Sequence, residues 1–298
     1  MVGGREEGEC RDRRGLLLKR LTEAQAKEYA AEGCTHPVRV FSAAQAAHYL
    51  SCLEAGERSM GAEFKKVLRT KAHLSLKWVD EVIHDSNVLD AVEDVIGPDI
   101  LLYNLTVWIK NANDPSFVGW HQDSTYFPLD PAVQVTAWIA LTDSVAENGS
   151  VNYLPGSQTL GQLRHAEAPG DGSLLSKGQH IVEPVDSSVV KTIPLQPGEM
   201  SLHHTRLVHY SDPNNSSRRR IGLGVSYIPT SVRCTGSVRH TAMLMRGVDR
   251  HNHFDHEPRV RFDFDPEVTA FRADAVARYY AARDEQVEIR TREFAAAR

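Results

Sequence analysis

Residues 197–228, PGEMSLHHTRLVHYSDPNNSSRRRIGLGVSYI, decide the fold of this chain. The turn residues Pro197-Gly198 and Asp212-Pro213-Asn214-Asn215 delimit an extended stretch at 200–209, and a second extended stretch follows at 221–228. Strands joined by turns, with no helix between them, are typical of an antiparallel sheet.

Other segments of the chain have the same character. They are short, rich in β-branched and aromatic residues, and bounded by Gly, Pro or Asn: 100–110, 133–142, 151–154 and 189–193. A run of such strands predicts an antiparallel sandwich or barrel. We therefore expect a mainly β fold with flanking helices, whose core is a double-stranded β-helix (a cupin-like jelly roll).

Helices are expected on both sides of this core. The capping boxes Thr22–Gln25 and Ser42–Gln45 predict helices over 23–32 and 43–56. A third helix is expected over 86–96, and residues 266–298 return to helix. We predict a single domain made of four parts: a disordered tail at 1–15, a mostly helical part at 16–98, the jelly-roll core at 99–230 and a C-terminal extension with helix at 231–298.

Composition excludes several classes of protein. The chain has 298 residues and a net charge of −5, which gives no global electrostatic reason to bind nucleic acid or an anionic membrane. Its four cysteines are scattered, so a disulfide framework is not expected. The apolar run Leu16–Leu18 is too short for a membrane span or a signal peptide. We expect a cytoplasmic protein with a small-molecule partner, and the sequence leaves the oligomeric state open.

Three H-x-D/E pairs are candidates for a metal site: His121/Asp123, His165/Glu167 and His253/Asp255. With 14 histidines and 39 acidic residues in the chain, chance alone predicts about two such pairs. Only the first pair is flanked by strands and followed by a distal histidine. On an extended chain His121 and Asp123 point to one face and Gln122 to the other. One more histidine would complete a 2-His-1-carboxylate triad, which suits iron(II).

Three histidines compete for that third position: His203, His204 and His209. The first two are adjacent, so only one of them can face the metal from a strand. Spacing alone does not choose among the three. Further along, Arg218–Arg220 enter a buried strand, where a guanidinium needs an anionic partner.

A known family shares these motifs in the same order. The chain carries WHQD at 120–123, WIALTD at 138–143, NGSVNYLPGS at 148–157, LHH at 202–204, HYSDPN at 209–214 and RRR at 218–220. This pattern resembles the phytanoyl-CoA dioxygenase family of iron(II)- and 2-oxoglutarate-dependent oxygenases, over roughly residues 25–230. The resemblance implies that His121, Asp123 and His209 bind the metal. It also implies that Arg220 holds the distal carboxylate of 2-oxoglutarate.

Further site residues follow from the same resemblance. Ser211 would support the distal carboxylate, Asn104 would contact 2-oxoglutarate, and Trp138 would lie near the iron. Gln122 and Tyr126 are candidates for the substrate pocket. His204 is expected beside the metal ligands or in that pocket.

The resemblance implies an enzyme that uses Fe(II), 2-oxoglutarate and O2. We expect it to hydroxylate an unactivated C–H bond of a small metabolite, with release of succinate and CO2. Desaturation, ring formation and epimerisation begin with the same hydrogen abstraction. The alternatives are a cupin-like metalloenzyme that does not use 2-oxoglutarate and a non-catalytic jelly-roll binding protein.

Two other segments bear on the substrate. A basic stretch from Phe64 to His73, with Lys65, Lys66, Arg69 and Lys71, would suit an anionic substrate, although a solvated helix face is the simpler explanation. The long turn-rich segment 156–188 is expected to be a lid or binding loop.

Overall fold

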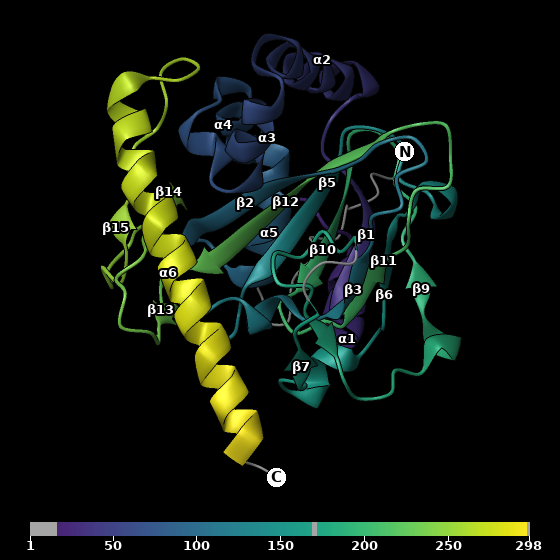
Figure 1. Cartoon of the computed structure of the whole chain (residues 1–298). Coiled ribbons are helices and arrows are strands. Elements are labelled where there is room, and N and C mark those ends of the chain that lie inside the picture. Colours follow the sequence, from purple (N-terminus) through teal and green to yellow (C-terminus); the bar gives the residue numbers. More distant parts are fainter. Residues whose placement is uncertain (1–16, 169–171, 297–298) are drawn as a thin grey trace, which may run out of the picture.

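The computed structural model describes residues 17–168 and 172–296, so the tail expected at 1–15 lies outside the described part of the chain. Two β-sheets face each other, helices cover the outer face of the larger sheet, and a long C-terminal helix runs down one side (Figure 1). The expected jelly roll with flanking helices is confirmed.

The larger sheet has the strand order β1-β10-β5-β12-β2-β14-β15. Neighbours are antiparallel from β1 to β14, and β15 joins β14 in parallel. The strands are β1 Cys34–Arg39, β2 Ile100–Lys110, β5 Val135–Ala140, β10 Glu199–His204, β12 Arg220–Pro229, β14 Thr241–Arg246 and β15 Asp255–His256.

The smaller sheet has the antiparallel order β3-β11-β6-β9. It consists of β3 Val118–His121, β11 His209–Ser211, β6 Val151–Tyr153 and β9 Lys191–Thr192. Two further sheets have two antiparallel strands each: β4 Leu129–Asp130 with β13 Arg233–Cys234, and β7 His165–Ala166 with β8 His180–Ile181.

The helices begin where the sequence predicts. Helix α1 is Glu23–Glu32 and helix α2 is Ala43–Met60, each opened by the expected capping box, although α2 continues one turn beyond residue 56. Helix α5 is Ser86–Ile96. Helices α3 (Ala62–Arg69) and α4 (Lys77–His84) complete the N-terminal layer, and α6 is Pro266–Ala296.

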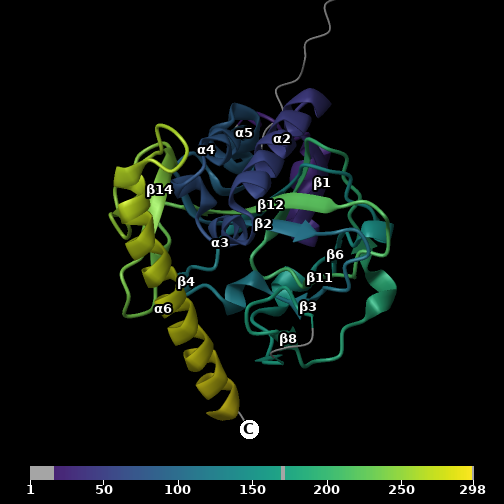
Figure 2. The same ribbon diagram turned by 45° about the horizontal axis from the view of Figure 1, so that its top comes forward.

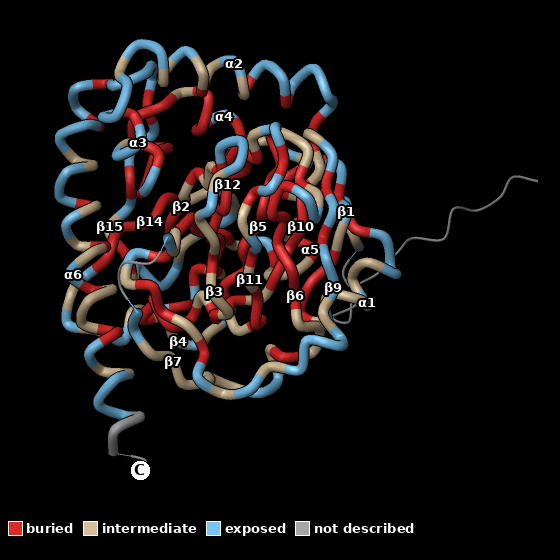
Figure 3. The backbone as a smooth tube through the Cα atoms, turned by 45° about the vertical axis from the view of Figure 1, so that its right-hand side comes forward, coloured by how far each residue is buried: buried red, intermediate tan, exposed pale blue. Residues whose placement is uncertain are grey.

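The main hydrophobic core lies between this helical layer and the outer face of the larger sheet. Leu53 of α2, Phe64 of α3 and Val79 of α4 belong to one buried cluster with Leu223 and Val225 of β12. The burial pattern in Figure 3 shows the same arrangement, since the sheet strands are mostly buried and the outer sides of α2 and α6 are exposed. Alternate residues of the strands point to the other face, which carries smaller hydrophobic clusters, with Tyr103 of β2 and Trp138 of β5, beside polar groups.

The structure differs from the sequence prediction in the edge strands. Strand β1 lies within the segment expected to be mostly helical and pairs with β10 through a bulge between Thr35 and Val38. Its sequence, CTHPVR, contains a proline and lacks hydrophobic alternation, which hides the strand. The strand expected over 189–193 is reduced to the two residues of β9, because 187–189 form a 3-10 turn.

The C-terminal helix α6 packs beside β14 and the end of the N-terminal helical layer (Figure 1). No helix in the described residues is both long enough and apolar enough to cross a membrane. The assignment of the chain to four parts of a single domain stays a prediction.

Candidate metal centre

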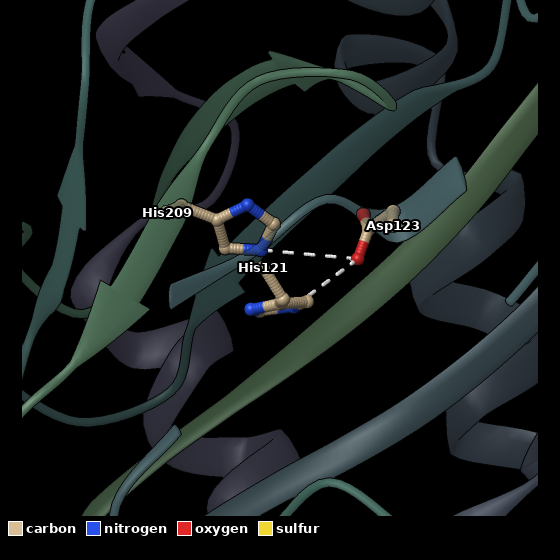
Figure 4. Close-up of side chains that lie close together, drawn as sticks. All are labelled: His121, Asp123 and His209. Carbon is tan, nitrogen blue, oxygen red and sulfur yellow. Dashed lines mark ion pairs between the residues drawn. The ribbon is translucent and has the colours of Figure 1, made fainter. Parts of the chain in front are cut away.

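The first two candidate ligands converge because the backbone stays extended between them. His121 is the last residue of β3, Gln122 is extended with φ −118° and ψ 133°, and Asp123 opens a 3-10 turn at Asp123–Thr125. Residues two apart in an extended chain share a face, so the imidazole and the carboxylate point to one site. Figure 4 shows both side chains directed toward His209.

His209 completes the group from the neighbouring strand. It is the first residue of β11 and is paired in register with His121. Its Nε2 lies 3.8 Å from Asp123 Oδ1, and His121 Nε2 lies 3.6 Å from the same oxygen. One ligand atom from each residue lies within 4.8 Å of the others, a spacing that allows a single metal ion to bind all three.

Both histidines present a free nitrogen to this space. Nδ1 of His121 lies 2.9 Å from the carbonyl oxygen of Gly119, and Nδ1 of His209 lies 2.9 Å from that of Leu207. A proton on Nδ1 satisfies each carbonyl and leaves the Nε2 lone pair for a metal. Burial and the nearby His121 lower the pKa of His209 well below its usual value, which keeps its ring neutral.

Hydrogen bonds orient the carboxylate of Asp123. Its Oδ2 accepts a hydrogen bond from Thr136 Oγ1 at 2.8 Å and lies 3.3 Å from His203 Nε2. Oδ1 is therefore the oxygen turned toward the two histidines. Burial acts to raise the pKa of Asp123, but His121 and His203 outweigh it and hold that pKa well below its usual range. The ligand is thus an anion.

Spacing leaves His203 open as an alternative third ligand, and the structure places it behind Asp123. Tyr153 Oη lies 2.8 Å from His203 Nδ1 and 2.9 Å from Ser201 Oγ, so the ring is fixed from its far side. His204 points to the opposite face of β10, where its Nδ1 accepts a hydrogen bond from the backbone N–H of Arg206 at 3.0 Å. Strand alternation predicts that only one of the two faces the metal ligands.

Arg220 opens β12 and is only 2% exposed. Its guanidinium carbon lies 5.3 Å from the centroid of the Trp138 ring. Nε has no hydrogen-bond partner, and no carboxylate of the described residues lies within 4 Å of the guanidinium. Burial lowers the pKa of Arg220 to about 10. A buried, unpaired cation of this kind fits an anionic ligand.

Gly222 makes room for this arrangement. A Cβ at Gly222 would lie 2.4 Å from Trp138 Cζ2, so a larger residue would displace the indole. Trp138 and Thr136 share the inner face of β5, because they are two residues apart. This face thus leads from the carboxylate of Asp123 to Arg220.

A second buried cation lies beside Arg220 and was missed by the sequence analysis. Lys110 ends β2 directly opposite Arg220, and its Nζ donates a hydrogen bond to Ser211 Oγ at 2.8 Å and another to the carbonyl of Asp212. Burial and the neighbouring Arg220 lower the pKa of Lys110 to about 7. The sequence feature that could have indicated Lys110 is a lysine at the end of the mostly apolar strand 100–110.

A cavity of about 350 Å³ opens onto the metal ligands and is lined by His121, Asp123, Tyr126 and Asn104, among others. A bulge at Tyr103 in β2, where Ser226 pairs with Asn104 but Tyr227 pairs with Leu102, turns Asn104 to the inner face. Asn104 donates a hydrogen bond to Tyr279 Oη at 3.2 Å. The Oδ1 of Asn104 and the hydroxyl of Tyr126 are buried and make no hydrogen bond to the described residues.

Gln122, the other pocket candidate, points away from this cavity. It is fully buried, and its Nε2 donates to the carbonyls of Gly161 and Arg206 at 2.9 and 2.8 Å. Its Oε1 accepts a hydrogen bond from the N–H of Leu163 at 2.8 Å. Gln122 therefore fastens the loop expected to be a lid to the metal-binding turn.

The two other H-x-D/E pairs do not form metal-ligand groups. His165 accepts a hydrogen bond from the N–H of Gln122 at 3.1 Å and supports the same loop. His256 lies 2.9 Å from Asp249 on the surface, and the rings of His251 and His253 stack with centroids 5.4 Å apart. Within residues 17–168 and 172–296, His121, Asp123 and His209 are the only group spaced to bind a metal.

Comparisons with known proteins agree with this geometry. The family model described as phytanoyl-CoA dioxygenase (PhyH) matches residues 31–222. A protein of Stutzerimonas stutzeri described as a probable alpha-ketoglutarate-dependent hypophosphite dioxygenase is 26% identical over 68% of this chain and 77% of its own length. The phytanoyl-CoA dioxygenase domain-containing protein 1 of Bos taurus is 35% identical over 35% of this chain and 36% of its own.

A solved structure is also similar. The apo form of the non-heme monooxygenase ThoJ superposes with a TM-score of 0.81 at 29% identity, over 89% of this chain and 99% of that one. The likeness therefore extends beyond the family-matched residues into the C-terminal extension.

Proposed function

The chain belongs to the phytanoyl-CoA dioxygenase family of iron(II)- and 2-oxoglutarate-dependent oxygenases, and from this premise we propose that it hydroxylates an unactivated C–H bond of a small metabolite. One observation carries the proposal. Two imidazoles and one carboxylate converge, and a buried arginine without an anionic partner in the described residues lies on the same side of the jelly roll.

The donor set fits iron(II). Two histidine nitrogens and one carboxylate oxygen would hold the ion and leave room on it for the co-substrate and O2. Iron with 2-oxoglutarate and O2 supplies the oxidation, in which the co-substrate is decarboxylated to succinate and CO2 and one oxygen atom goes to the substrate. The protein's own part is to bind, orient and shield.

Each protein group has a defined task in this scheme. His121 and His209 keep Nε2 available because backbone carbonyls hold the Nδ1 protons. Thr136 and His203 keep Asp123 turned to the metal through Oδ2.

The co-substrate is bound at the far end of the same inner face. Arg220 takes the distal carboxylate of 2-oxoglutarate, and Ser211, oriented by Lys110, adds a hydroxyl. Trp138 packs against the guanidinium and fixes its plane. Fixing the diacid at both ends orders the reacting centre before the substrate arrives.

The carboxylate of Asp123 bears on the outcome of the reaction. Halogenating relatives have a small residue at this position, which leaves room for a halide on the metal. Because Asp123 is present and held by two partners, we expect hydroxylation, or another reaction that begins with the same hydrogen abstraction, and not halogenation. The substrate would enter through the cavity between Asn104, Tyr126 and α6.

An anaerobic titration tests the proposal. Iron(II) and 2-oxoglutarate added to the protein should give a weak visible charge-transfer band. Arg220→Ala should weaken the dependence of that band on 2-oxoglutarate. Arg218→Ala is the matched control, because Arg218 is exposed and pairs with Asp143 at 2.9 Å. Absence of the band in the unaltered protein would reject the proposal.

Turnover gives a second test, in which succinate release is screened against classes of small molecules. Asp123→Ala should abolish substrate hydroxylation. If that variant hydroxylated its substrate at the normal rate, the assignment of Asp123 as a ligand would be wrong.

A further inference from the structure

The outer half of the cavity lies between helices α3 and α6. Lys65 and Arg69 of α3 are four residues apart, share one face of the helix and line the cavity. Lys66, between them in sequence, is instead paired with Glu63 at 2.8 Å on the exposed side. The basic stretch of the sequence is thus divided: Lys65 and Arg69 line the cavity, and Lys66 faces solvent. Lys71 and His73 are buried and pair with Glu257.

Helix α6 forms the opposite wall, and it lies outside the family-matched residues 31–222. Tyr279, Tyr280 and Arg283 line the cavity from this helix. The hydroxyls of Tyr280 and Thr70 lie 2.8 Å apart, which ties α6 to the end of α3. Figure 2 shows α3 beside the upper part of α6.

The charges around the cavity are unbalanced. Among its acidic residues, Glu57 is held by Arg219 at 2.6 and 3.0 Å, and Asp114 accepts the backbone N–H groups of its own turn. Asp123 belongs to the metal centre. No carboxylate of residues 17–168 and 172–296 lies within 4 Å of Lys65 or Arg69. Arg69 makes one long hydrogen bond, 3.4 Å, to the carbonyl of Leu174.

The space between this rim and the metal ligands is apolar and aromatic. Leu68, Trp108 and Phe127 form its walls. At the inner end, the free Oδ1 of Asn104 and the free hydroxyl of Tyr126 are an acceptor and a donor.

We propose that this enzyme takes an anionic substrate with an aromatic or apolar body, whose carboxylate, phosphate or sulfonate rests on Lys65 and Arg69. Its other end carries a polar group that meets Asn104 and Tyr126 beside the metal ligands. This inference rests on the proposed function and names the substrate class of the same site. The anion is bound at the rim because the cations there lack a carboxylate partner in the described residues, whereas the inner end is occupied by the metal-ligand residues His121 and Asp123.

A matched pair of fluorescent probes tests the inference on the full chain with iron(II) and 2-oxoglutarate under anaerobic conditions. 8-Anilino-1-naphthalenesulfonate has an aromatic body and one anionic group, and N-phenyl-1-naphthylamine is the same body without the sulfonate. The double variant Lys65→Ala/Arg69→Ala should bind the sulfonate about tenfold more weakly than the unaltered protein. Affinity for the neutral probe should change less than twofold.

Lys66→Ala is the control, because it removes a cation from the same helix but outside the cavity. It should change the affinity for either probe less than twofold. Equal affinity of the double variant and the unaltered protein for the sulfonate, or no sulfonate binding at all, would overturn the inference. The visible band of iron(II) and 2-oxoglutarate, recorded in the same samples, reports separately on the proposed function.

Discussion

Arg220→Met should stabilise the protein without ligands and at the same time weaken its binding of 2-oxoglutarate. Methionine has a similar length and no charge. Burial lowers the pKa of Arg220 from 12.5 to about 10, and at 1.36 kcal/mol per pKa unit this corresponds to about 3 kcal/mol against the charged form. Losing the contact with Trp138 costs about 1–2 kcal/mol. The expected net gain is therefore about 1–2 kcal/mol in the free energy of unfolding.

The affinity of Arg220→Met for 2-oxoglutarate should fall, although its stability should rise. Removing one partner of a buried charge pair typically costs 2 kcal/mol or more, so the Kd for 2-oxoglutarate should rise at least about 30-fold. Urea unfolding of the protein without iron or co-substrate measures the first effect. Anaerobic calorimetry with iron(II) present measures the second.

Arg218→Met serves as the control for both measurements. Arg218 is 57% exposed and paired with Asp143, so its loss should change the unfolding free energy by less than about 1 kcal/mol and leave 2-oxoglutarate binding unchanged. A destabilised Arg220→Met protein that still bound 2-oxoglutarate normally would refute the reasoning.

Three further predictions follow from the site. Thr136→Val removes the 2.8 Å hydrogen bond to Asp123 Oδ2 and should weaken iron(II) binding about 10- to 100-fold in a metal competition assay. The control Thr192→Val, in the exposed strand β9, should leave iron(II) affinity unchanged. If Thr136→Val bound iron(II) as tightly as the unaltered protein, the role of Thr136 would be contradicted. Lys110 has a pKa of about 7 in the folded protein, against 10.5 for a lysine in water. Between pH 7 and 10.5 the unfolded chain therefore binds more protons than the folded protein, so the free energy of unfolding should rise with pH from about 7. Urea unfolding at pH 7 and pH 9 should show this rise. In Lys110→Met the difference between the two pH values should be smaller. Gly222→Ala places a Cβ 2.4 Å from the Trp138 ring and should lower the free energy of unfolding by about 1–3 kcal/mol. It should also weaken 2-oxoglutarate binding. An unaltered Kd for 2-oxoglutarate would mean that Trp138 does not orient Arg220.

Much of the fold follows from local sequence signals. Alternating strands with turn residues between them predicted most of the jelly roll, and the two capping boxes predicted where α1 and α2 begin. Strand β1 was not predicted, because CTHPVR has no alternating pattern of its own and is a strand only through its pairing with β10. Long-range pairing of this kind leaves little trace in a short segment.

The sequence indicated the candidate metal ligands better than the groups around them. His121 and Asp123 followed from two-residue alternation, whereas His209 required the family resemblance, because spacing could not separate it from His203 and His204. Thr136 and Lys110 were missed because their roles depend on which strands lie side by side. Tyr279 and Arg283 line the cavity because of the path of helix α6, which begins more than 130 residues after Asp123. No local sequence pattern reveals this proximity.

The most direct test of the central claim is anomalous diffraction at the iron edge from crystals grown anaerobically with iron(II) and 2-oxoglutarate. We expect one strong peak within bonding distance of His121 Nε2, His209 Nε2 and Asp123 Oδ1, with the distal carboxylate of the diacid on Arg220. A peak bound by other side chains, such as the surface histidines at 251 and 253, or a diacid far from Arg220, would contradict the account.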